Sequence, residues 1–577
     1  MCRALAAASL LLLAPGCGSA ENARPIVGGG GGSSSAGGGG ASAGGTNMGA
    51  GAAPLGGASA NGGSGGSTGG RPSGCAVGQR DCDGRCSNLN DRDHCGSCEN
   101  ACKTGQICAV TVCVAEDQPC PEGLTRCEDA CVNLQTAPDT CGTCDRACAP
   151  SQGCAAGQCL CEAGDVNCGG GPLLLSVGPT RHYLVNGVGT PFQLRGDSPW
   201  TMSVQLTREQ VAEYLDNRQA KKFNTLLMEV VETKFGDAAP ANAYGDEPFR
   251  GADFTQPNEA YWQHIDYIVA EASARGFLVL MCALYLGYGG GDEGWFAAAS
   301  QAGVSAVESY GAFLGARYGG ADNIIWVNGG DFQPPNLDIP NALAAGILSK
   351  DQRHLFSTHW ARNSSGTDGA PGWLTLGSSY TEQGNVSARV LADYQAAPPL
   401  PTFLIEAYYE GTFEGQPQVT TQTVRQQAWH ALLSGAAGAL YGHHTVWPFD
   451  ADWQAALDSD GARSMAHLHG FFEALRWWEL APDASSKLVT AGRGTLGTAG
   501  YVAAALSADG ALAVVYVPDG REITVDLSQL SGPVTARVFD PASGVFSPVT
   551  GSPFGSGGSQ KIDPPGGSDA VLLFEAK

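Results

Sequence analysis

The sequence predicts a multidomain protein in which a (β/α)8 TIM barrel is followed by an antiparallel β-sandwich and preceded by disulfide-rich repeats and a disordered Gly/Ser linker. Three observations lead to this fold class. Apolar strand-like segments alternate with amphipathic helical segments over residues 172–487. Short strands separated by Asp-Gly and Asp-Pro turns follow over residues 488–577. Of the 21 cysteines, 18 fall within residues 75–171.

The composition limits the classes of partner. The chain has 577 residues, which predicts several domains, and a formal net charge of -24 with only 15% charged residues. The acidity therefore reflects a shortage of basic residues. Such a surface repels the phosphates of nucleic acids, and no Lys/Arg cluster opposes this, so we expect no nucleic-acid partner. We expect a monomer.

Residues 1–17 have the features of an export signal. The apolar core at 5–13 is too short to span a bilayer. It ends at Gly16-Cys17, which resembles a bacterial lipobox, although Ala14 stands where Leu is commonest. We expect lipidation of Cys17 and anchoring to a membrane, at the outer membrane or cell surface of a Gram-negative bacterium. An ordinary cleaved signal peptide, and hence a secreted protein, is the alternative.

Residues 18–74 are predicted to be a linker rich in Gly, Ser and Ala. From residue 28 onward, Met48 and Leu55 are its only large apolar side chains. Such a segment cannot bury enough surface to offset its chain entropy, so we expect a flexible coil. A coil of this length would hold the following domains away from a membrane anchor.

The cysteine-rich segment contains two repeats of eight cysteines, offset by 45 or 46 residues. An even number in an exported chain predicts four disulfides in each repeat, with the connectivity left open. Zinc is the alternative, because two C-x2-C pairs have finger-like spacing. Cys161 and Cys168 begin an incomplete third copy. The repeats comprise Cys75, Cys82, Cys86, Cys95, Cys98, Cys102, Cys108 and Cys113, then Cys120, Cys127, Cys131, Cys141, Cys144, Cys148, Cys154 and Cys159.

Eight apolar segments predict the strands of the barrel. A doubly wound sheet is the alternative, but no Gly-x-Gly-x-x-Gly follows the first strand, so no nucleotide cofactor is expected. Helices are predicted at 208–220, 259–275, 305–318, 341–348 and 423–433. The predicted strands span 192–195, 225–230, 277–283, 324–328, 355–358, 375–376, 402–406 and 439–442 in the barrel, and 501–506, 512–517, 522–527, 534–539 and 570–575 in the sandwich.

Two predicted barrel strands end in a carboxyl group. The fourth strand runs into Gly329-Gly330-Asp331, and the seventh ends at Glu406. In such barrels the reactive groups lie at the C-terminal ends of the strands. A pair of carboxyls across the barrel mouth suits glycosidic hydrolysis, in which one group gives a proton and the other attacks or activates water. The alternative for either residue alone is a structural carboxylate that caps a helix or pairs with Arg.

Other polar and aromatic residues near the predicted strand ends are candidate sugar binders, because aromatic faces stack on sugars and polar groups bind hydroxyls. Each could instead be part of the packing. Adjacent histidines rarely chelate a metal without further ligands, so we predict no metal. The lone Cys282 is read as a small buried apolar residue. The candidate substrate-binding residues are Asp197, Trp200, Tyr285, Asn328, His359, Trp360, Tyr380, Tyr408, His443 and His444.

Three motifs resemble the apiosidase-like glycoside hydrolases. They are the runs at 194–200, 325–331 and 404–411. The runs at 514–520 and 538–544 are similar to the C-terminal sandwich of many of these enzymes, labelled a proposed collagen-binding domain of a collagenase. The resemblance extends from about residue 172 to the end of the chain. The cysteine repeats are outside it, and they resemble Stig1-like modules of exported bacterial lipoproteins.

The resemblance implies that Asp331 is the general acid/base and Glu406 the nucleophile of a retaining hydrolase. It points to apiose-containing polysaccharide as the substrate, with no cofactor. Gly-Gly-Asp replaces the Asn-Glu of many other glycosidase barrels, so the acid is shorter here. Our leading hypothesis is thus an exported glycoside hydrolase. The alternatives are a non-catalytic carbohydrate- or matrix-binding surface lipoprotein and, without any protease motif in its favour, a collagenase-like protease.

Overall fold

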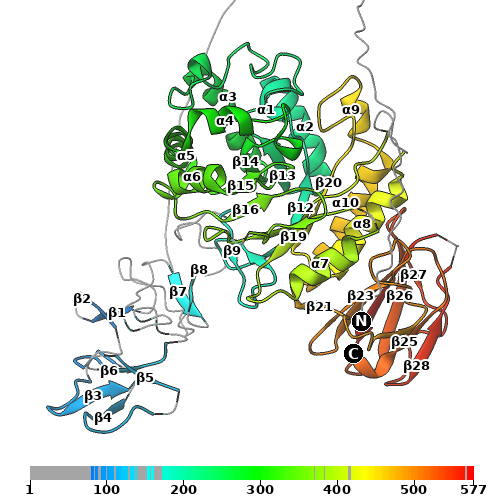
Figure 1. The fold of residues 1–577 in the computed structure, drawn as a ribbon. Helices are drawn as coiled ribbons and strands as arrows, with labels where there is room; N and C mark the ends of the chain where they lie inside the picture. The colour runs from blue at the N-terminus through cyan, green and yellow to red at the C-terminus, as the bar shows by residue number, and fades with distance from the viewer. Residues whose placement is uncertain are drawn as a thin grey trace, which may run out of the picture. The chain divides into compact units, whose positions relative to one another are not determined.

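A computed structural model describes residues 172–577 except 370, 383, 413–417 and 566–567, together with parts of 79–161 (Figure 1). The predicted signal peptide, Cys17 and the linker to residue 74 lie outside the described residues, as does part of the cysteine repeats. Within the described part of the chain, we find no helix with the length and apolar character needed to cross a bilayer.

The cysteine repeats form disulfide-linked β-hairpins. Four described disulfides join Cys95–Cys108, Cys102–Cys113, Cys120–Cys131 and Cys127–Cys144. In the first repeat, the two described disulfides join the fourth cysteine to the seventh and the sixth to the eighth. In the second repeat, they join the first cysteine to the third and the second to the fifth. Taken together, the four disulfides use each of the eight repeat positions once. Disulfides are therefore confirmed, and the sulfurs in them are not free to bind zinc. The strands are β1 (Gln79–Cys82), β2 (Arg85–Asn88), β3 (Gln106–Ala109), β4 (Val112–Ala115), β5 (Thr125–Cys127), β6 (Ala130–Val132), β7 (Gln152–Ala155) and β8 (Gln158–Cys161).

The central domain is the predicted barrel. Its parallel strands follow the order β16-β15-β14-β13-β12-β20-β19-β18, and β17 is paired antiparallel to β18. Between β16 and β18 the barrel is joined by individual hydrogen bonds in place of a ladder, including Ser378 Oγ to Thr358 O at 2.6 Å. The strands are β12 (Leu194–Asp197), β13 (Thr225–Glu229), β14 (Leu278–Tyr285), β15 (Ile324–Gly329), β16 (Phe356–His359), β17 (Ser364–Ser365), β18 (Gly377–Tyr380), β19 (Thr402–Glu406) and β20 (Gly438–Tyr441).

Helices surround these strands, and all five predicted helices are present (Figure 1). The start of α2 is fixed by a capping box, in which Thr207 and Gln210 bond each other's backbone N–H. Cys282 is buried inside the barrel, as expected. The helices are α1 (Met202–Gln205), α2 (Arg208–Ala220), α3 (Glu259–Ala274), α4 (Phe296–Ala302), α5 (Val304–Tyr318), α6 (Asp338–Leu348), α7 (Val386–Tyr394), α8 (Thr421–Leu433), α9 (Trp453–Ala456) and α10 (Asp460–Glu473).

Short strands flank the barrel, and a β-sandwich follows it. A small sheet of β9 (Ser176–Val177), β10 (Leu184–Val185) and β11 (Pro191–Phe192) precedes β12. The sandwich has a six-stranded sheet in the order β21-β23-β24-β29-β26-β27 and a three-stranded sheet in the order β22-β25-β28. Its strands are β21 (Leu480–Pro482), β22 (Val489–Ala491), β23 (Ala503–Ser507), β24 (Leu512–Val517), β25 (Ile523–Asp526), β26 (Val534–Asp540), β27 (Val545–Pro548), β28 (Ser559–Ile562) and β29 (Ala570–Ala576).

The sandwich packs against helix α8 of the barrel. Trp429 stacks on Tyr516 with ring centroids 5.9 Å apart and planes 7° from parallel. The buried guanidinium of Arg425 binds both carboxylate oxygens of Asp569, at 2.7 and 3.0 Å. Apolar residues of both domains contribute to one hydrophobic core. Barrel and sandwich are thus held together by packing and by a paired buried charge.

Candidate active site

A cavity of about 320 Å³ opens at the C-terminal ends of the barrel strands. Both predicted catalytic carboxyls line it, and so do five of the predicted sugar binders. The size suits a small part of a ligand such as one or two sugar units. The lining residues are Trp200, Glu229, Phe235, Tyr285, Tyr288, Glu293, Asp331, Arg362, Tyr380, Glu406, Ala407, Tyr408, Tyr409, His444 and Trp447.

The Gly-Gly-Asp turn after β15 places Asp331 in this cavity. Gly329, Gly330 and Asp331 have φ values of 109°, 110° and 49°. A Cβ atom on Gly329 would lie 2.4 Å from the carbonyl oxygen of His359, and one on Gly330 would lie 2.2 Å from the ring of Tyr285. Only glycine fits this path at both positions. The left-handed φ of Asp331 is a strained conformation for a residue with a side chain, and such strain is commonly found at functional sites.

Asp331 has one oxygen bound by the protein and one left without a partner. Its Oδ2 accepts a hydrogen bond from the hydroxyl of Tyr285 at 2.8 Å. Its Oδ1 is buried and has no hydrogen-bond partner among the described residues. A buried carboxyl oxygen is costly to leave unbonded unless a ligand or a proton completes it. Oδ1 of Asp331 is therefore open to a hydrogen bond with a bound molecule.

His359 joins the two carboxyl residues. Its Nε2 lies 2.6 Å from Oε2 of Glu406, and its Nδ1 accepts the backbone N–H of Asp331 at 2.9 Å. The acceptor role of Nδ1 leaves the ring proton on Nε2, which therefore donates to Glu406. Burial lowers the pKa of His359, but the hydrogen bond to Glu406 and the charges of Glu406 and Asp331 together outweigh burial and raise it. A second proton on Nδ1 would nevertheless break the bond of Nδ1 to the backbone. The neutral ring with N–H at Nε2 satisfies both contacts.

Opposing effects act on Glu406, whose side chain is 14% exposed. Burial raises the pKa of Glu406 above the usual carboxyl value, and the neighbouring charge of Asp331 raises it further. Hydrogen bonds from His359 and Tyr409 act in the other direction, because they stabilise the ionised form. Glu406 thus has two donors for its negative charge, whereas Asp331 has one side-chain donor.

The two carboxyl groups are close together. One carboxylate oxygen of Asp331, one of Glu406 and one ring nitrogen of His359 all lie within 4.8 Å of each other. This trio could in principle ligate a metal ion. However, both nitrogens of His359 are engaged, so an ion at Nε2 would have to displace the proton shared with Glu406. The same spacing allows both carboxyls to act on one bond of a bound molecule.

Aromatic rings form the walls around the carboxyl pair. The indole of Trp200 lies edge-on to the ring of His359, with centroids 5.2 Å apart, and donates Nε1–H to the hydroxyl of Tyr409 at 2.7 Å. Tyr380 lies 5.0 Å from His359 between ring centroids. Tyr408 is 38% exposed and binds Glu382 through its hydroxyl at 2.9 Å. These rings offer flat apolar faces beside the reactive groups, as sugar-binding sites do.

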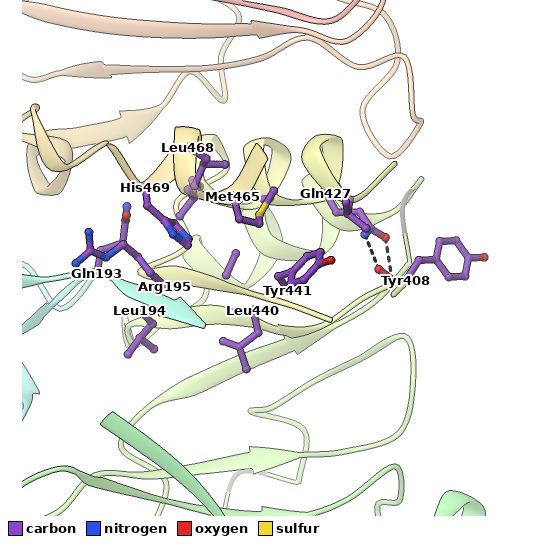
Figure 2. A pocket seen from close by; sticks show the side chains of 14 residues that line it. Gln193, Leu194, Arg195, Tyr408, Gln427, Leu440, Tyr441, Met465, Leu468 and His469 are labelled. Carbon is purple, nitrogen blue, oxygen red and sulfur yellow. Dashed lines mark hydrogen bonds between the residues drawn. The ribbon is translucent and has the colours of Figure 1, made fainter. Parts of the chain in front are cut away.

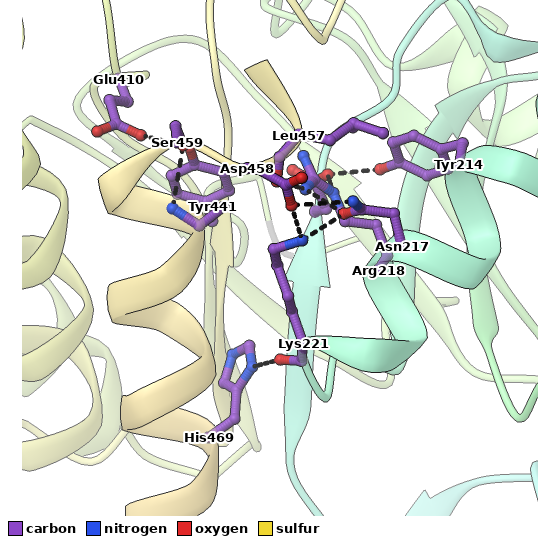
Figure 3. A network of polar contacts seen from close by, with 12 residues as sticks. Tyr214, Asn217, Arg218, Lys221, Glu410, Tyr441, Leu457, Asp458, Ser459 and His469 are labelled. Atoms are coloured by element: carbon purple, nitrogen blue, oxygen red, sulfur yellow. Dashed lines mark hydrogen bonds and ion pairs between the residues drawn. The ribbon is translucent and has the colours of Figure 1, made fainter. Parts of the chain in front are cut away.

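Asp197 lies outside this lining although it ends the first barrel strand. It is buried, and its Oδ2 accepts bonds from Tyr214 Oη and Arg218 Nε, each at 2.5 Å. The guanidinium extends into a wider polar network, in which its Nη1 donates to the carbonyl of Leu457 at 2.8 Å (Figure 3). A second carboxylate of this network, Glu410, is bound by hydroxyl and backbone donors. Asp197 in this structure serves to join β12 to α2.

Four other predicted sugar binders also do not line the cavity. Asn328 donates Nδ2–H to the carbonyl of Pro340 at 3.2 Å, and Trp360 donates Nε1–H to Asp368 O at 3.1 Å. His443 accepts the backbone N–H of Thr445 at 3.1 Å. The fourth is His359, which contacts both carboxyl residues. His444, which follows His443 in the chain, does line the cavity, and burial lowers the pKa of His444 to about 4.

Several lining residues are absent from the sequence prediction. Glu229 is the clearest, because it ends β13 just as Glu406 ends β19. The predicted strand extends to residue 230, which hides Glu229 inside it. Tyr409 lies three residues after Glu406, within the run 404–411 that resembles the family, so the sequence could have indicated it. Glu293, Arg362 and Trp447 come from loops whose course the sequence alone does not fix.

A second, much smaller cavity lies between β12, β20, α8 and α10 (Figure 2). Its volume of about 10 Å³ has room for roughly one water molecule, so it cannot hold a sugar. On its wall, Gln427 forms two hydrogen bonds with the backbone of Tyr408, at 2.9 and 3.0 Å. This contact fixes the loop after Glu406 to helix α8.

Comparisons with known proteins match both the barrel and the sandwich. Residues 179–479 match the family model described as "Apiosidase-like, catalytic domain", and residues 486–575 match a proposed collagen-binding domain of a collagenase. No curated protein matches the sequence significantly.

Solved structures share the fold. One described as a glycoside hydrolase is 22% identical, with a TM-score of 0.62, covering 70% of this chain and 97% of that chain. A family 5 glycoside hydrolase from Bacteroides vulgatus ATCC 8482 is 23% identical, with a TM-score of 0.63, covering 71% of this chain and 94% of that chain.

Proposed function

The chain belongs to the apiosidase-like family of glycoside hydrolases, and from that premise we propose that it is a retaining enzyme with Glu406 as nucleophile and Asp331 as general acid/base. The observation that carries this proposal is the short separation of the two carboxyls, whose nearest oxygens lie within 4.8 Å. Retaining glycosidases have carboxyl groups about 5–5.5 Å apart, whereas inverting enzymes need roughly 6.5–9.5 Å to admit a water molecule. These spacings refer to whole carboxyl groups, and a pair of oxygens within 4.8 Å of each other favours the shorter spacing.

The hydrogen bonds support the division of roles. The nucleophile must be ionised, and Glu406 receives the N–H of His359 together with a bond from Tyr409. The acid must hold a proton that it can give away, and Asp331 has a free oxygen at Oδ1. The general-acid role requires a proton on Asp331 when the substrate is bound, and Oδ1 is the oxygen with room to carry it.

The reaction then has two steps. Asp331 protonates the leaving oxygen while Glu406 attacks the anomeric carbon, which breaks the glycosidic bond and forms a glycosyl ester on Glu406. Asp331, now ionised, removes a proton from a water molecule that attacks the same carbon. The sugar leaves with its original anomeric configuration, Glu406 is released as a carboxylate, and Asp331 regains its proton.

The substrate that we propose is a polysaccharide or oligosaccharide. The aromatic walls and the cavity volume of about 320 Å³ fit a sugar unit at the carboxyl pair. The family description suggests an apiose-containing chain. We further propose that the monomeric enzyme is exported and anchored through Cys17. The attachment is testable by mass spectrometry of the mature N-terminus, in the native chain and in Cys17→Ser.

A glycan panel tests the catalytic proposal directly. We expect product release by the native enzyme, with retained anomeric configuration by proton NMR of the first product. A slow 2-fluoro-glycoside substrate is expected to leave one glycosyl group on the peptide containing Glu406. If the product has inverted configuration, or if Glu406→Gln retains native turnover, the proposal is wrong.

A further inference from the structure

Glu229 is a third carboxyl group in the cavity, and the two-step reaction gives it no role. It is the last residue of β13, and its backbone N–H donates to the carbonyl of Trp200 at 3.0 Å. The residue is only 2% exposed, yet it lines the same cavity as Asp331. A fixed strand end and deep burial hold its carboxyl in one place.

One oxygen of the Glu229 carboxyl lacks a hydrogen-bond partner among the described residues. This oxygen, Oε2, is fully buried. The nearby carboxyl of Glu232 is better provided, because its Oε1 accepts backbone N–H groups of the next three residues at 2.6, 2.6 and 3.1 Å. Three backbone donors stabilise an ionised carboxylate. The protein therefore supports the charge of Glu232 and not that of Glu229.

The electrostatic surroundings lead to the same assignment. Burial raises the pKa of Glu229 well above the usual value, and the charge and hydrogen bond of Glu232 raise it further. Asp331 and Glu293 add smaller effects of the same sign. An ionised carboxylate with no donor, surrounded by acidic groups, is strongly disfavoured in a buried position. Burial without a donor on Oε2 and the adjoining acidic groups thus favour the neutral acid form of Glu229 over its carboxylate.

A metal ion is a poorer explanation of this carboxyl pair. A metal site would need at least one more ligand close to Glu229 and Glu232. Among the described residues, the groups of His, Cys, Asp and Glu spaced for a metal do not include either glutamate. A proton on Glu229, bonded to Glu232 until a bound sugar hydroxyl offers another acceptor, accounts for two adjoining carboxyls without any third group.

We propose that Glu229 is a specificity residue whose neutral carboxylic acid donates a hydrogen bond to a hydroxyl group of the sugar unit held between Asp331 and Glu406. The inference builds on the proposed glycosidase function. A neutral acid offers an O–H donor and a C=O acceptor together, and a sugar hydroxyl can satisfy both. An ionised carboxylate could only accept. The site would then reject a sugar that lacks this hydroxyl, because the buried acid would be left unpaired.

Two substitutions separate the donor role from charge. Glu229→Ala removes the donor, and we expect kcat/KM to fall roughly 10- to 100-fold, the cost of an unmade hydrogen bond at a buried site. Glu229→Gln keeps a neutral donor of the same length, so its loss should be at least about tenfold smaller. Thermal unfolding of both variants controls for folding. Equal losses in the two variants with unchanged stability would overturn the proposal.

Monodeoxy substrates provide the readout that a structural role would not produce. With the analogue that lacks the contacted hydroxyl, native enzyme and Glu229→Ala should have the same kcat/KM. If the ratio between them stays constant across every deoxy analogue, Glu229 contacts no hydroxyl and the proposal fails.

Infrared difference spectroscopy tests the protonation state without any turnover. The spectrum of the native protein minus that of Glu229→Gln, at neutral pH, should contain the C=O band of a protonated carboxylic acid. A carboxylate band in its place would refute the neutral acid even if the enzyme is active. Conversely, the acid band in a protein that cleaves no glycan would refute the proposed function and leave the protonation of Glu229 intact.

Discussion

Two groups of carboxylates at the barrel rim differ in how the protein treats their charge. Asp197, at the end of β12, is buried against Arg218 and Tyr214, so its charge is neutralised within the fold. Asp331 and Glu406 are close to each other, and neither forms an ion pair with Arg or Lys among the described residues. Asp197 and Asp331 each have one buried oxygen without a hydrogen-bond partner, so the basic partner is what distinguishes the two sites. The pair that we propose to be catalytic is the one that lacks such a partner.

The energetic consequence is opposite at the two sites. At Asp197 the Coulomb attraction to Arg218 compensates for the loss of water, so the folded state depends on both partners. At the active site, burial and like charge make ionised Glu406 unfavourable, as the raised pKa shows. In the mechanism that we propose, the fold tolerates a cost at Glu406 that a substrate can turn into catalysis.

The largest expected effect comes from substitution within the active pair. We expect Glu406→Gln to lower kcat at least about 10³-fold, because the amide cannot form the glycosyl ester. Asp331→Asn should have a smaller effect on substrates with a good leaving group, since these need no proton for departure. Initial rates on activated and natural glycosides measure both. Equal sensitivity of the two variants to the leaving group would contradict the assigned roles.

Breaking the ion pair between Asp197 and Arg218 should lower the stability of the fold and leave turnover largely unchanged. Arg218→Met leaves an unpaired buried carboxylate, and we expect a loss of about 3–5 kcal/mol in the free energy of unfolding. Urea unfolding followed by tryptophan fluorescence measures this loss. The kcat of the protein that remains folded should change far less than in Glu406→Gln.

The matched control replaces both partners. In the double variant Asp197→Asn/Arg218→Met no charge is left buried, so it should recover a large part of the stability lost in the single variant. If the double variant is less stable than Arg218→Met, then the ion pair does not explain the stability of this site.

His359 gives the proposed catalytic pair a donor of the kind that stabilises Asp197, because its N–H stabilises the charge of Glu406. In His359→Ala the N–H donor to Glu406 is lost, so the pKa of Glu406 should rise further. Glu406 must be ionised to attack, and hence the acidic limb of the kcat/KM profile should move to higher pH, with a fall of roughly 10- to 100-fold at neutral pH. An acidic limb at its native position would show that His359 does not tune Glu406.

Much of this fold could be predicted from the sequence, and the reasons are local. The helix α2 matched the prediction because its apolar period and its Thr207 cap act within one segment. The strand β18 was displaced from the predicted 375–376 to 377–380, because Ser378 and Ser379 have low strand propensity and are ordered by tertiary contacts.

The site was less predictable because it depends on distant residues. Asp331 and Glu406 share a visible rule, a carboxyl after an apolar strand, and that rule also selects Asp197. Nothing near Asp197 in the sequence shows that Arg218, 21 residues later, returns to bind it. Glu229 follows the same rule but was concealed within an overlong predicted strand. The carboxyl groups differ in the hydrogen-bond donors and basic partners that the fold brings to each of them. Those partners become visible only in three dimensions.

The smallest predicted effect is a gain in stability on removing charge from the active pair. The raised pKa of Glu406 means that protonation of this carboxyl stabilises the folded state relative to the unfolded state. This contribution is complete below the unfolded-state pKa and is lost as pH rises through the folded-state pKa. Glu406→Gln does not titrate, so it should become more stable than the native protein as pH rises from acid to neutral, by about 1 kcal/mol. Urea unfolding at several pH values measures the difference. Asp197→Asn, which leaves Arg218 unpaired, should be less stable than the native protein at neutral pH, and the same sign in both variants would remove the distinction between the two sites.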